Sequence, residues 1–324
     1  MSFSSGIKEE LSRHLGNARH CRIAEIAAII NISGQVEYNV ELNKYGIKVH
    51  TENPTVARKY FTLLKKTFNI KVEVVMRRSH HLMKKRVYNV YILKKDDVIK
   101  VLQACHLLEK GKVYHHIDPL LVATTCCKRS YIRGAFLASG SMSEPEKTYH
   151  LEIVDMNELH SQELMKLVNH FDMDAKIILR KKYHVIYIKE GKQIVEFLNV
   201  IEAHVALMEL ENLRILKEMR NNVNRIVNCE TANIKKTVSA AVRQVSDIMY
   251  IEEHLGLEML SEPLEELARL RLEHSEASLK ELGQMLSPSV GKSGVNHRLR
   301  KISGFAEELR DKREDLSWSK RKSK

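Results

Sequence analysis

A nine-residue apolar pattern that ends in Ser-Gly occurs twice in this chain, 106 residues apart, and it constrains the fold more than any other feature. The copies are residues 26–34 and residues 132–140. Both are apolar, contain small residues and end in Ser-Gly, a pattern typical of a helix that packs closely against another helix. We expect each helix to stop at a left-handed glycine. Such a repeat predicts two copies of one structural unit.

The segments that follow the two copies also match in order. The first copy is followed by alternating residues at 36–42, a helix over about 55–68, strands over 71–78 and 86–94, and a helix from Asp96. The second is followed by a strand over 149–154, a helix over about 161–171, strands over 175–182 and 184–189, and a helix from Gln193. The order αββαββα occurs twice, which predicts duplicated α+β units.

Beyond residue 196 the pattern is helical, with a second helix predicted from Ile234 to His254 and a break near Gly256. The predicted fold is therefore an α+β N-terminal region followed by an all-α domain. We predict five parts along the chain: an N-terminal helix (1–20), repeat 1 (21–112), repeat 2 with a linker helix (113–220), an all-α DNA-binding domain (221–310) with a helix-turn-helix at about 275–307, and a basic tail (311–324) without regular structure.

The balance of charge favours a polyanionic partner. The formal net charge is +12 and the pI is about 9.3, which suits a nucleic acid or an acidic membrane surface, although a merely basic protein has the same balance. The most apolar stretch, residues 23–32, is too short to span a bilayer, and the first residues do not resemble a signal peptide. We therefore expect a cytoplasmic, nucleoid-associated protein with no membrane partner.

The cysteines and histidines do not have the spacing of a metal site. The five cysteines include no CxxC motif, which also argues against a disulfide framework. The pairs His80-His81 and His115-His116 are adjacent, and adjacent residues of a regular element cannot both face one metal. The sequence therefore predicts no metal and no cofactor.

The helix-turn-helix is predicted from a capped helix, a turn and a second capped helix in succession. Ser278 and Glu281 have the spacing of a capping box, and Gly283 provides the small residue at which a following helix can cross. After a turn over residues 287–292, Ser293 is predicted to cap the next helix. The side chains that would face inward on that helix are Val295, Leu299 and Ile302.

The other side of this last helix is basic and polar. Residues 292–305 contain four Lys or Arg, one His and no acidic residue. Asn and Arg can bond to the edges of adenine and guanine, and cations can hold phosphates. An ordinary amphipathic basic helix in a small bundle is the alternative. The candidate DNA-binding residues are Lys292, Ser293, Asn296, His297, Arg298, Arg300 and Lys301.

The predicted strand pairs of both repeats are also basic. On a strand, alternate residues face one side, so a row of cations could follow a phosphate backbone. A solvated sheet face or a charged edge that prevents aggregation would give the same pattern. The candidate backbone contacts are Arg77, Arg78, Lys84, Lys85, Arg86, Arg180, Lys181 and Lys182.

Several stretches together resemble a known family. The helices ending in Gly34 and Gly140 resemble those of the LAGLIDADG homing endonuclease fold. Combined with residues 1–4, 133–141, 145–152 and 295–301, the whole chain looks like the bacterial WhiA regulators. This resemblance implies a LAGLIDADG-like region joined to a helix-turn-helix similar to region 4 of sigma factors. It also implies a role in transcription regulation, with sporulation in some bacteria and cell division or chromosome segregation in others.

The resemblance to the nucleases allows a test of enzyme activity. In those enzymes the acidic residue before the final glycine of each motif helix binds the catalytic metal. Ser33 and Ser139 occupy these positions here, and the earlier acidic positions are Asn31 and Leu137. A neutral hydroxyl cannot replace a pair of carboxylates. The sequence therefore predicts that the chain is not an enzyme and has no catalytic residues.

The predicted function is sequence-specific binding of double-stranded DNA in transcription regulation. RNA polymerase, a sigma factor or another regulator is the expected further partner. One alternative is a nucleoid-associated interaction protein that binds DNA mainly nonspecifically and works through protein partners. The other is a metal-dependent nuclease of the homing type, which the two serines oppose.

Overall fold

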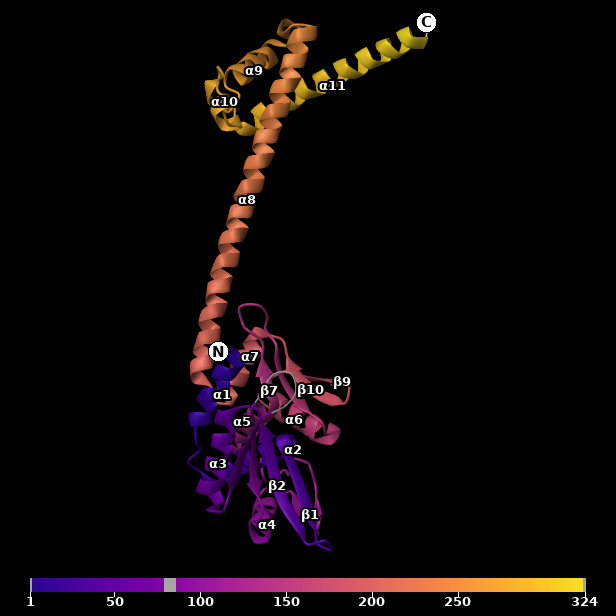
Figure 1. Cartoon of the computed structure of the whole chain (residues 1–324). Helices are drawn as coiled ribbons and strands as arrows, with labels where there is room; N and C mark the ends of the chain where they lie inside the picture. The colour runs from indigo at the N-terminus through magenta and orange to yellow at the C-terminus, as the bar shows by residue number, and fades with distance from the viewer. Residues whose placement is uncertain (1, 79–85, 323–324) are drawn as a thin grey trace. The chain divides into compact units, whose positions relative to one another are not determined.

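The duplicated α+β unit is present, and both copies have the same order of elements (Figure 1). The computed structural model describes residues 2–78 and 86–322. The first copy consists of α2 (Arg19–Ser33), β1 (Gly34–Asn39), β2 (Lys44–Thr51), α3 (Pro54–Phe68), β3 (Glu73–Arg78), β4 (Arg86–Ile92) and α4 (Lys95–Ala104). The second consists of α5 (Thr125–Ser139), β7 (Gly140–Met142), β8 (Leu151–Asp155), α6 (Glu158–Asn169), β9 (Lys176–Arg180), β10 (Tyr183–Ile188) and α7 (Gly191–Val200). The predicted order αββαββα is confirmed.

The two sheets have matching topology. Their strand orders are β1-β2-β4-β3 and β7-β8-β10-β9, with antiparallel pairing throughout. In the first sheet Ile47 lies opposite Ile92, and in the second Ile153 lies opposite Ile186. All four side chains are buried, so each sheet turns one face to its helices and leaves the other face free.

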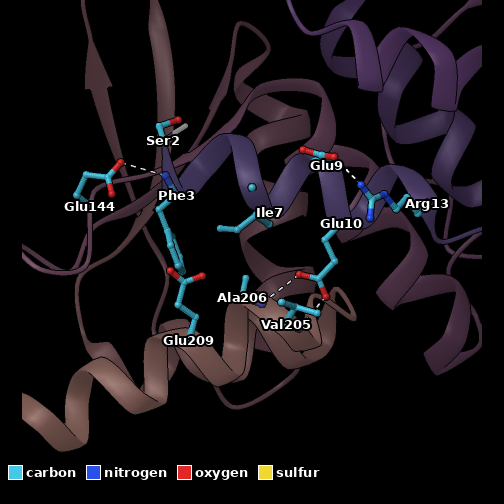
Figure 2. A pocket seen from close by; sticks show the side chains of 11 residues that line it. Ser2, Phe3, Ile7, Glu9, Glu10, Arg13, Glu144, Val205, Ala206 and Glu209 are labelled. Atoms are coloured by element: carbon cyan, nitrogen blue, oxygen red, sulfur yellow. Dashed lines mark hydrogen bonds and ion pairs between the residues drawn. The ribbon is translucent and has the colours of Figure 1, made fainter.

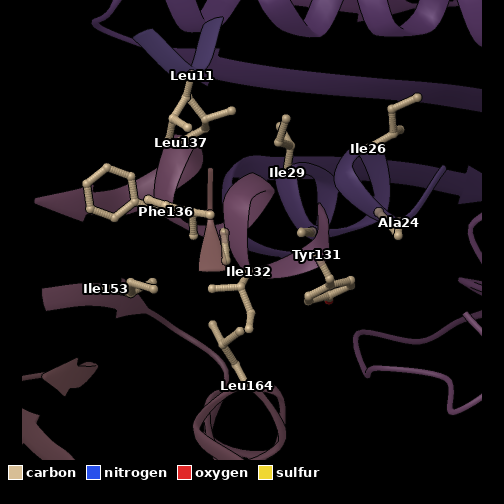
Figure 3. Close-up of a cluster of buried hydrophobic side chains, with 14 of the residues drawn as sticks. Leu11, Ala24, Ile26, Ile29, Tyr131, Ile132, Phe136, Leu137, Ile153 and Leu164 are labelled. Atoms are coloured by element: carbon tan, nitrogen blue, oxygen red, sulfur yellow. The ribbon is translucent and has the colours of Figure 1, made fainter. Parts of the chain in front are cut away.

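Helices α2 and α5, which contain the repeated segment, pack directly against each other at the centre of this region. A Cβ atom on Gly134 would lie 2.5 Å from the backbone oxygen of Glu25 and 3.0 Å from the Cβ of Ala28, so only glycine permits this approach. Figure 3 shows Ile29 of α2 and Ile132 of α5 in one buried cluster. The core of the region is therefore built around the helix pair.

The prediction that these helices end at left-handed glycines is wrong. Gly34 has φ −86° and Gly140 has φ −67°, both in extended backbone. Each helix passes directly into a strand that begins at the glycine itself. A Cβ at Gly34 would lie 2.3 Å from the Ile30 carbonyl oxygen, and one at Gly140 would lie 2.6 Å from that of Phe136. Close approach to the last helical turn, and not a positive φ, is what requires glycine.

The remaining elements of this region are short, apart from one long helix. They are α1 (Phe3–Arg13), the small strands β5 (Leu108–Glu109) and β6 (Lys112–Val113), and the first part of α8 (His204–His254). The predicted start of a separate helix at Ile234 is wrong, because α8 runs through it. Residues 201–254 contain neither glycine nor proline, so the helix has no residue at which to break. The chain divides within α8 into two units, Met1–Glu218 and Met219–Lys324.

Over the described residues of the second unit, every regular element is a helix. It contains the last part of α8, a short 3₁₀ turn (Leu257–Met259), α9 (Glu262–Glu273), α10 (Leu279–Met285) and α11 (Lys292–Lys322). Its core includes Ile248, Leu267 and Leu282. The tail from residue 311 was predicted to lack regular structure, but α11 continues to Lys322. No glycine or proline follows Gly304, and residues 306–316 consist mostly of good helix formers.

No helix among the described residues is both long enough and apolar enough to cross a lipid bilayer.

Candidate nucleic-acid interface

The predicted capping box at the start of α10 is present. The Ser278 hydroxyl accepts the backbone N–H of Glu281, and the Glu281 carboxylate accepts the backbone N–H of Ser278 at 2.7 Å. The backbone N–H of Ser278 lowers the pKa of Glu281, because it donates to the charged form of the carboxylate. The start of this seven-residue helix is thereby fixed by local sequence.

Gly283 is required by a contact that differs from the expected one. Across the turn, the backbone N–H of Val290 donates to the Gly283 carbonyl at 2.8 Å. A Cβ on Gly283 would lie 2.0 Å from the Val290 carbonyl oxygen and 3.1 Å from a methyl carbon of Val295. The turn before α11 therefore crosses Gly283 more closely than α11 itself does.

The inner face of α11 agrees with the prediction, but its first residue does not. Val295, Leu299 and Ile302 are all buried against the helical core. The helix begins at Lys292, and the backbone N–H of Val295 donates to the Gly291 carbonyl. Ser293 is thus the second residue of the helix and not its N-cap. Gly291 occupies the position before the helix, where glycine is also tolerated.

The outer side of α11 has the predicted basic residues available to a ligand. Lys292, Ser293, His297, Arg300 and Lys301 are exposed, while Asn296 and Arg298 are half-buried at the edges of the inner face. None of these seven side chains has a hydrogen bond or ion pair to another residue in the described part of the chain. Their polar groups are therefore available to a nucleic acid.

An ion-pair network that we did not predict holds α11 against α8. The Asp247 carboxylate is buried, and Arg310 donates to it at 2.8 Å. Arg243, one turn earlier on α8, pairs with Glu307. The Arg310 guanidinium also lies 4.7 Å from the ring centroid of Tyr250. Arg243 and Asp247 are four residues apart, a spacing that is common on exposed helices. The spacing therefore does not indicate that both residues pair with α11.

Arg271 is a second residue that sequence reasoning missed. Its guanidinium is buried and donates to the Gln244 side chain at 3.1 Å and to the Ala277 carbonyl at 2.5 Å. Burial lowers its pKa. The side chain connects α8 to the loop that precedes α10, so it positions the helix-turn-helix instead of contacting a ligand.

The basic residues of the two sheets do not form the single row that strand alternation allowed. Arg77 and Arg180 lie on the free faces of their sheets, opposite Val87 and Tyr183 respectively. Arg86, whose Cα is paired with that of Arg78 in the strand register, lies on the side that faces the helices. Lys181 and Lys182 form the turn between β9 and β10. Lys84 and Lys85 lie outside the described residues.

The two free-face arginines differ in their surroundings. Arg180 is 3.5 Å from the Glu152 carboxylate, which also accepts from His150. Arg77 is exposed and has no ion pair with another described residue. Part of the charge of Arg180 is therefore neutralised within the protein, whereas that of Arg77 is not.

Ser33 and Ser139 end the paired helices at the positions predicted from the nuclease pattern. Nearby, the Asn31 amide donates to the Tyr131 hydroxyl at 2.9 Å, and that hydroxyl bonds the ring of His160 at 2.7 Å. Burial raises the pKa of Tyr131 above its ordinary range. The Ser139 hydroxyl is buried without a hydrogen-bond partner among the described residues. The helix ends thus present neutral hydroxyls instead of a pair of carboxylates.

A hollow of about 530 Å³ in the first unit does not suit a nucleic acid (Figure 2). Four glutamates line it, including Glu10 and Glu144. Glu10 accepts the backbone N–H groups of Val205 and Ala206 at 2.8 and 3.1 Å, which caps the start of α8. Glu144 accepts the N–H of Phe3 at 3.0 Å. These carboxylates repel phosphate and serve to hold α1 and α8 in place.

Three family models match successive parts of the chain. They describe a WhiA N-terminal LAGLIDADG-like domain at residues 19–108, a WhiA LAGLIDADG-like domain at residues 128–220, and a WhiA C-terminal HTH domain at residues 223–306.

Relatives and a solved structure match over nearly the whole length. Two relatives bear the name "Probable cell division protein WhiA". The one from Lachnoclostridium phytofermentans is 51% identical over 314 residues, covering 96% of this chain and 100% of the relative. The one from Alkaliphilus oremlandii is 48% identical over 315 residues, covering 96% and 98%. The crystal structure of full-length DUF199/WhiA from Thermatoga maritima matches with a TM-score of 0.60 and 28% identity, covering 95% of this chain and 99% of that one.

Proposed function

Because the chain belongs to the WhiA family, we propose that it binds specific sequences of double-stranded DNA through α11 and thereby regulates transcription. The outer side of α11 carries this proposal. Lys292, Arg300 and Lys301 are exposed there without an intramolecular partner among the described residues, and Asn296 lies beside them. In this arrangement Asn296 and Arg300 bond to base edges and the lysines hold phosphates. Ser293, Asn296 and His297 lie in the first two turns of α11, the end that enters the major groove first.

We propose further that the first unit is a scaffold without enzyme activity. Hydrolysis of a phosphodiester by the homing endonuclease route requires carboxylates that hold divalent metals. Ser33 and Ser139 occupy the ends of α2 and α5, and their hydroxyls cannot replace the paired charges. A magnesium-dependent nicking activity that stays with the protein through repeated purification would contradict this proposal.

The process in which the protein acts is proposed from its relatives, which are called probable cell division proteins. We assign the chain to cell division and chromosome segregation, with sporulation in hosts that form spores, and place it on the nucleoid. RNA polymerase or a sigma factor is the proposed further partner. Genome-wide crosslinking, with an Asn296→Ala strain as the matched control, tests this assignment. Sites that are occupied equally in both strains would argue that DNA contact does not depend on α11.

Specific and nonspecific binding are separated by competition. The labelled duplex is one selected by the protein from a random pool, and the competitors are the same duplex and a scrambled one at physiological salt. We expect the selected duplex to compete roughly 10³-fold better or more. Equal competition would favour the alternative, a nucleoid-associated protein that binds DNA mainly nonspecifically.

Replacing the proposed base contacts should reduce both affinity and discrimination. Asn296→Ala and Arg300→Ala are each expected to cost about 1–3 kcal/mol of binding to the selected duplex, with a weaker preference over the scrambled one. Lys235→Ala is the control, because Lys235 is an exposed cation of the same unit on α8. The measurement is fluorescence anisotropy at fixed salt. A Lys235 variant that loses as much as Arg300→Ala would indicate a purely electrostatic effect.

The free sheet faces are expected to contribute to DNA binding without sequence preference. Arg77→Ala is expected to weaken binding to all duplexes alike and to reduce the magnitude of the salt slope by about 1 for each phosphate that the variant no longer neutralises. Arg180→Ala should have a smaller effect, because Glu152 already neutralises part of its charge. The salt dependence of binding for the two variants provides the measurement. Unchanged slopes would mean that the basic sheet residues do not touch DNA.

A further inference from the structure

Four side chains with the chemistry of metal ligands meet at the starts of α2 and α5. They are His20 and Cys21 from α2 and Cys126 and Cys127 from α5, and their ligand atoms all lie within 4.8 Å of one another. The Nδ1 atom of His20 is 3.0 Å from the sulfur of Cys127 and 3.5 Å from that of Cys21. The proposed DNA-binding function makes no use of this cluster.

The duplication explains how residues so far apart in sequence converge. His20 and Cys126 are the second residues of their helices, and Cys21 and Cys127 are the third, so both pairs are separated by the same 106 residues as the repeated segments. Because α2 and α5 pack as equivalent helices, equivalent positions meet near the axis between them. Spacing along the chain does not reveal this cluster, because neither pair of neighbouring residues has a complete set of metal ligands by itself.

Adjacent residues in the middle of a helix cannot both face one metal, but the residues of this cluster lie in the first turns of their helices. Side chains of a helix lean toward its N-terminus. In the middle of a helix two neighbours point about 100° apart, but in the first turn both can extend beyond the end of the helix. Cys21 and Cys127 are buried, whereas His20 and Cys126 are exposed. The four ligands thus approach one point from two helix ends.

The donor set corresponds to a particular metal. One imidazole nitrogen and three sulfurs form the Cys₃His set typical of structural zinc, and soft thiolates select zinc over magnesium or calcium. With Zn–S bonds of about 2.3 Å, tetrahedral sulfurs lie about 3.8 Å apart, so only small movements of the side chains are needed. All four positions of the tetrahedron are filled by protein atoms, which indicates a structural and not a catalytic site.

The surroundings of the cluster affect its sulfurs unequally: burial raises the pKa of the Cys21 thiol to about 11, whereas the hydrogen bond with the Thr124 hydroxyl lowers the pKa of Cys126. Neither α2 nor α5 has a side-chain N-cap hydrogen bond, so backbone N–H groups at both starts remain available to the sulfurs. The Thr124 hydroxyl lies 3.2 Å from the sulfur of Cys126 and can orient it. A shallow cavity of about 230 Å³ lined by His20, Thr124 and Cys127 provides a path for an ion. Three thiolates with one Zn²⁺ leave a single negative charge, which two helix N-termini stabilise.

We propose that one Zn²⁺ ion is bound by Nδ1 of His20 and the sulfurs of Cys21, Cys126 and Cys127, and that it joins the N-termini of the paired helices. The ion stabilises the first unit at the end of the helix pair opposite Ser33 and Ser139. Its binding is linked to folding, so removal of the metal lowers the stability of the unit.

The test uses the full-length protein, reduced and freed of metal with a chelator. We expect Zn²⁺ to bind one ion per chain and raise the melting temperature, and Co²⁺ to produce the visible and near-ultraviolet absorption of a tetrahedral thiolate complex. Cys126→Ser and His20→Gln replace exposed ligands and should each weaken Zn²⁺ binding at least about tenfold. Cys229→Ser, which removes an exposed cysteine of α8, should bind Zn²⁺ as the unaltered protein does.

Two results would overturn the proposal. One is a reduced wild-type protein that binds no Zn²⁺. The other is Zn²⁺ affinity that stays the same in both Cys126→Ser and His20→Gln. Circular dichroism of each variant without metal distinguishes loss of the ligand from loss of the fold, and either variant alone is sufficient if the other does not fold.

Discussion

Glu25→Gln is expected to reduce the free energy of unfolding of the first unit by about 3–5 kcal/mol, the cost of leaving buried charge without its partner. Glu25 is completely buried on α2. Its carboxylate lies 3.0 Å from the ammonium of Lys59 and 3.4 Å from the guanidinium of Arg133, both of which are also buried. Glutamine has nearly the same shape but no charge. The change therefore isolates the electrostatic contribution, measured by urea unfolding with the midpoint and the slope fitted separately.

The two cations differ in the partners that they keep when Glu25 loses its charge. Lys59 donates to the carbonyls of Leu11 and His14, while Arg133 retains Glu202 and the Ser130 hydroxyl. Carbonyls satisfy the donors of Lys59 but not its charge. Adding Lys59→Met to Glu25→Gln should therefore recover part of the lost stability, because it removes the cation that has lost its only carboxylate partner among the described residues.

The loss in Glu25→Gln should also depend on pH. Burial lowers the pKa of Lys59, and Glu25 opposes that shift. Without Glu25 the folded-state pKa falls further below the ordinary value of 10.5, which remains that of the unfolded chain. The unfolded state then binds more protons between these two values, so the stability of the variant rises with pH across that window. Denaturation of both proteins at several alkaline pH values measures this, and a deficit that widens there would be contrary to the argument.

Glu9→Gln is the matched control for the same substitution at the surface. Glu9 pairs with Arg13 across one turn of α1, and both side chains are substantially exposed. Such pairs contribute less than about 1 kcal/mol. If Glu9→Gln and Glu25→Gln cost the same, the central network does not have the importance assigned to it.

Gly283→Ala is expected to reduce the stability of the second unit by about 2–3 kcal/mol and to abolish specific DNA binding while every proposed contact residue remains. In an ordinary helix this substitution stabilises by up to about 1 kcal/mol, so the predicted sign is reversed. The reason is steric: the new Cβ would lie 2.0 Å from the Val290 carbonyl oxygen, which is backbone and cannot rotate away. The turn must shift, and α11 begins directly after it.

Gly304→Ala provides the comparison in the same unit. A Cβ at Gly304 meets no atom within 4 Å, so here the helix propensity of alanine should act alone and stability should rise slightly. Thermal unfolding and binding to the selected duplex are measured for both variants. Equal changes of stability in the two variants would show that the turn does not press on Gly283.

Local signals predicted much of the helix-turn-helix correctly. The Ser278 capping box and the inner face formed by Val295, Leu299 and Ile302 agree with the structure because each depends on residues close together in sequence. The start of α11 was predicted too late, since Gly291 and Ser293 can both precede a helix and only the packing of the turn selects between them. The ion pairs of Asp247 with Arg310 and of Arg243 with Glu307 join distant segments and have no comparable signal.

The repeat separates the features that the sequence determines from those that depend on the packing of α2 against α5. The 106-residue period by itself determined that two equivalent αββαββα units form, because hydrophobic periodicity and chain breaks are local properties of the chain. The reason for Gly34 and Gly140, the burial of Glu25 between two cations, and the meeting of His20 with three cysteines were decided only when α2 and α5 came together. Each of these features depends on distances between atoms of separate segments, and no local pattern encodes such distances.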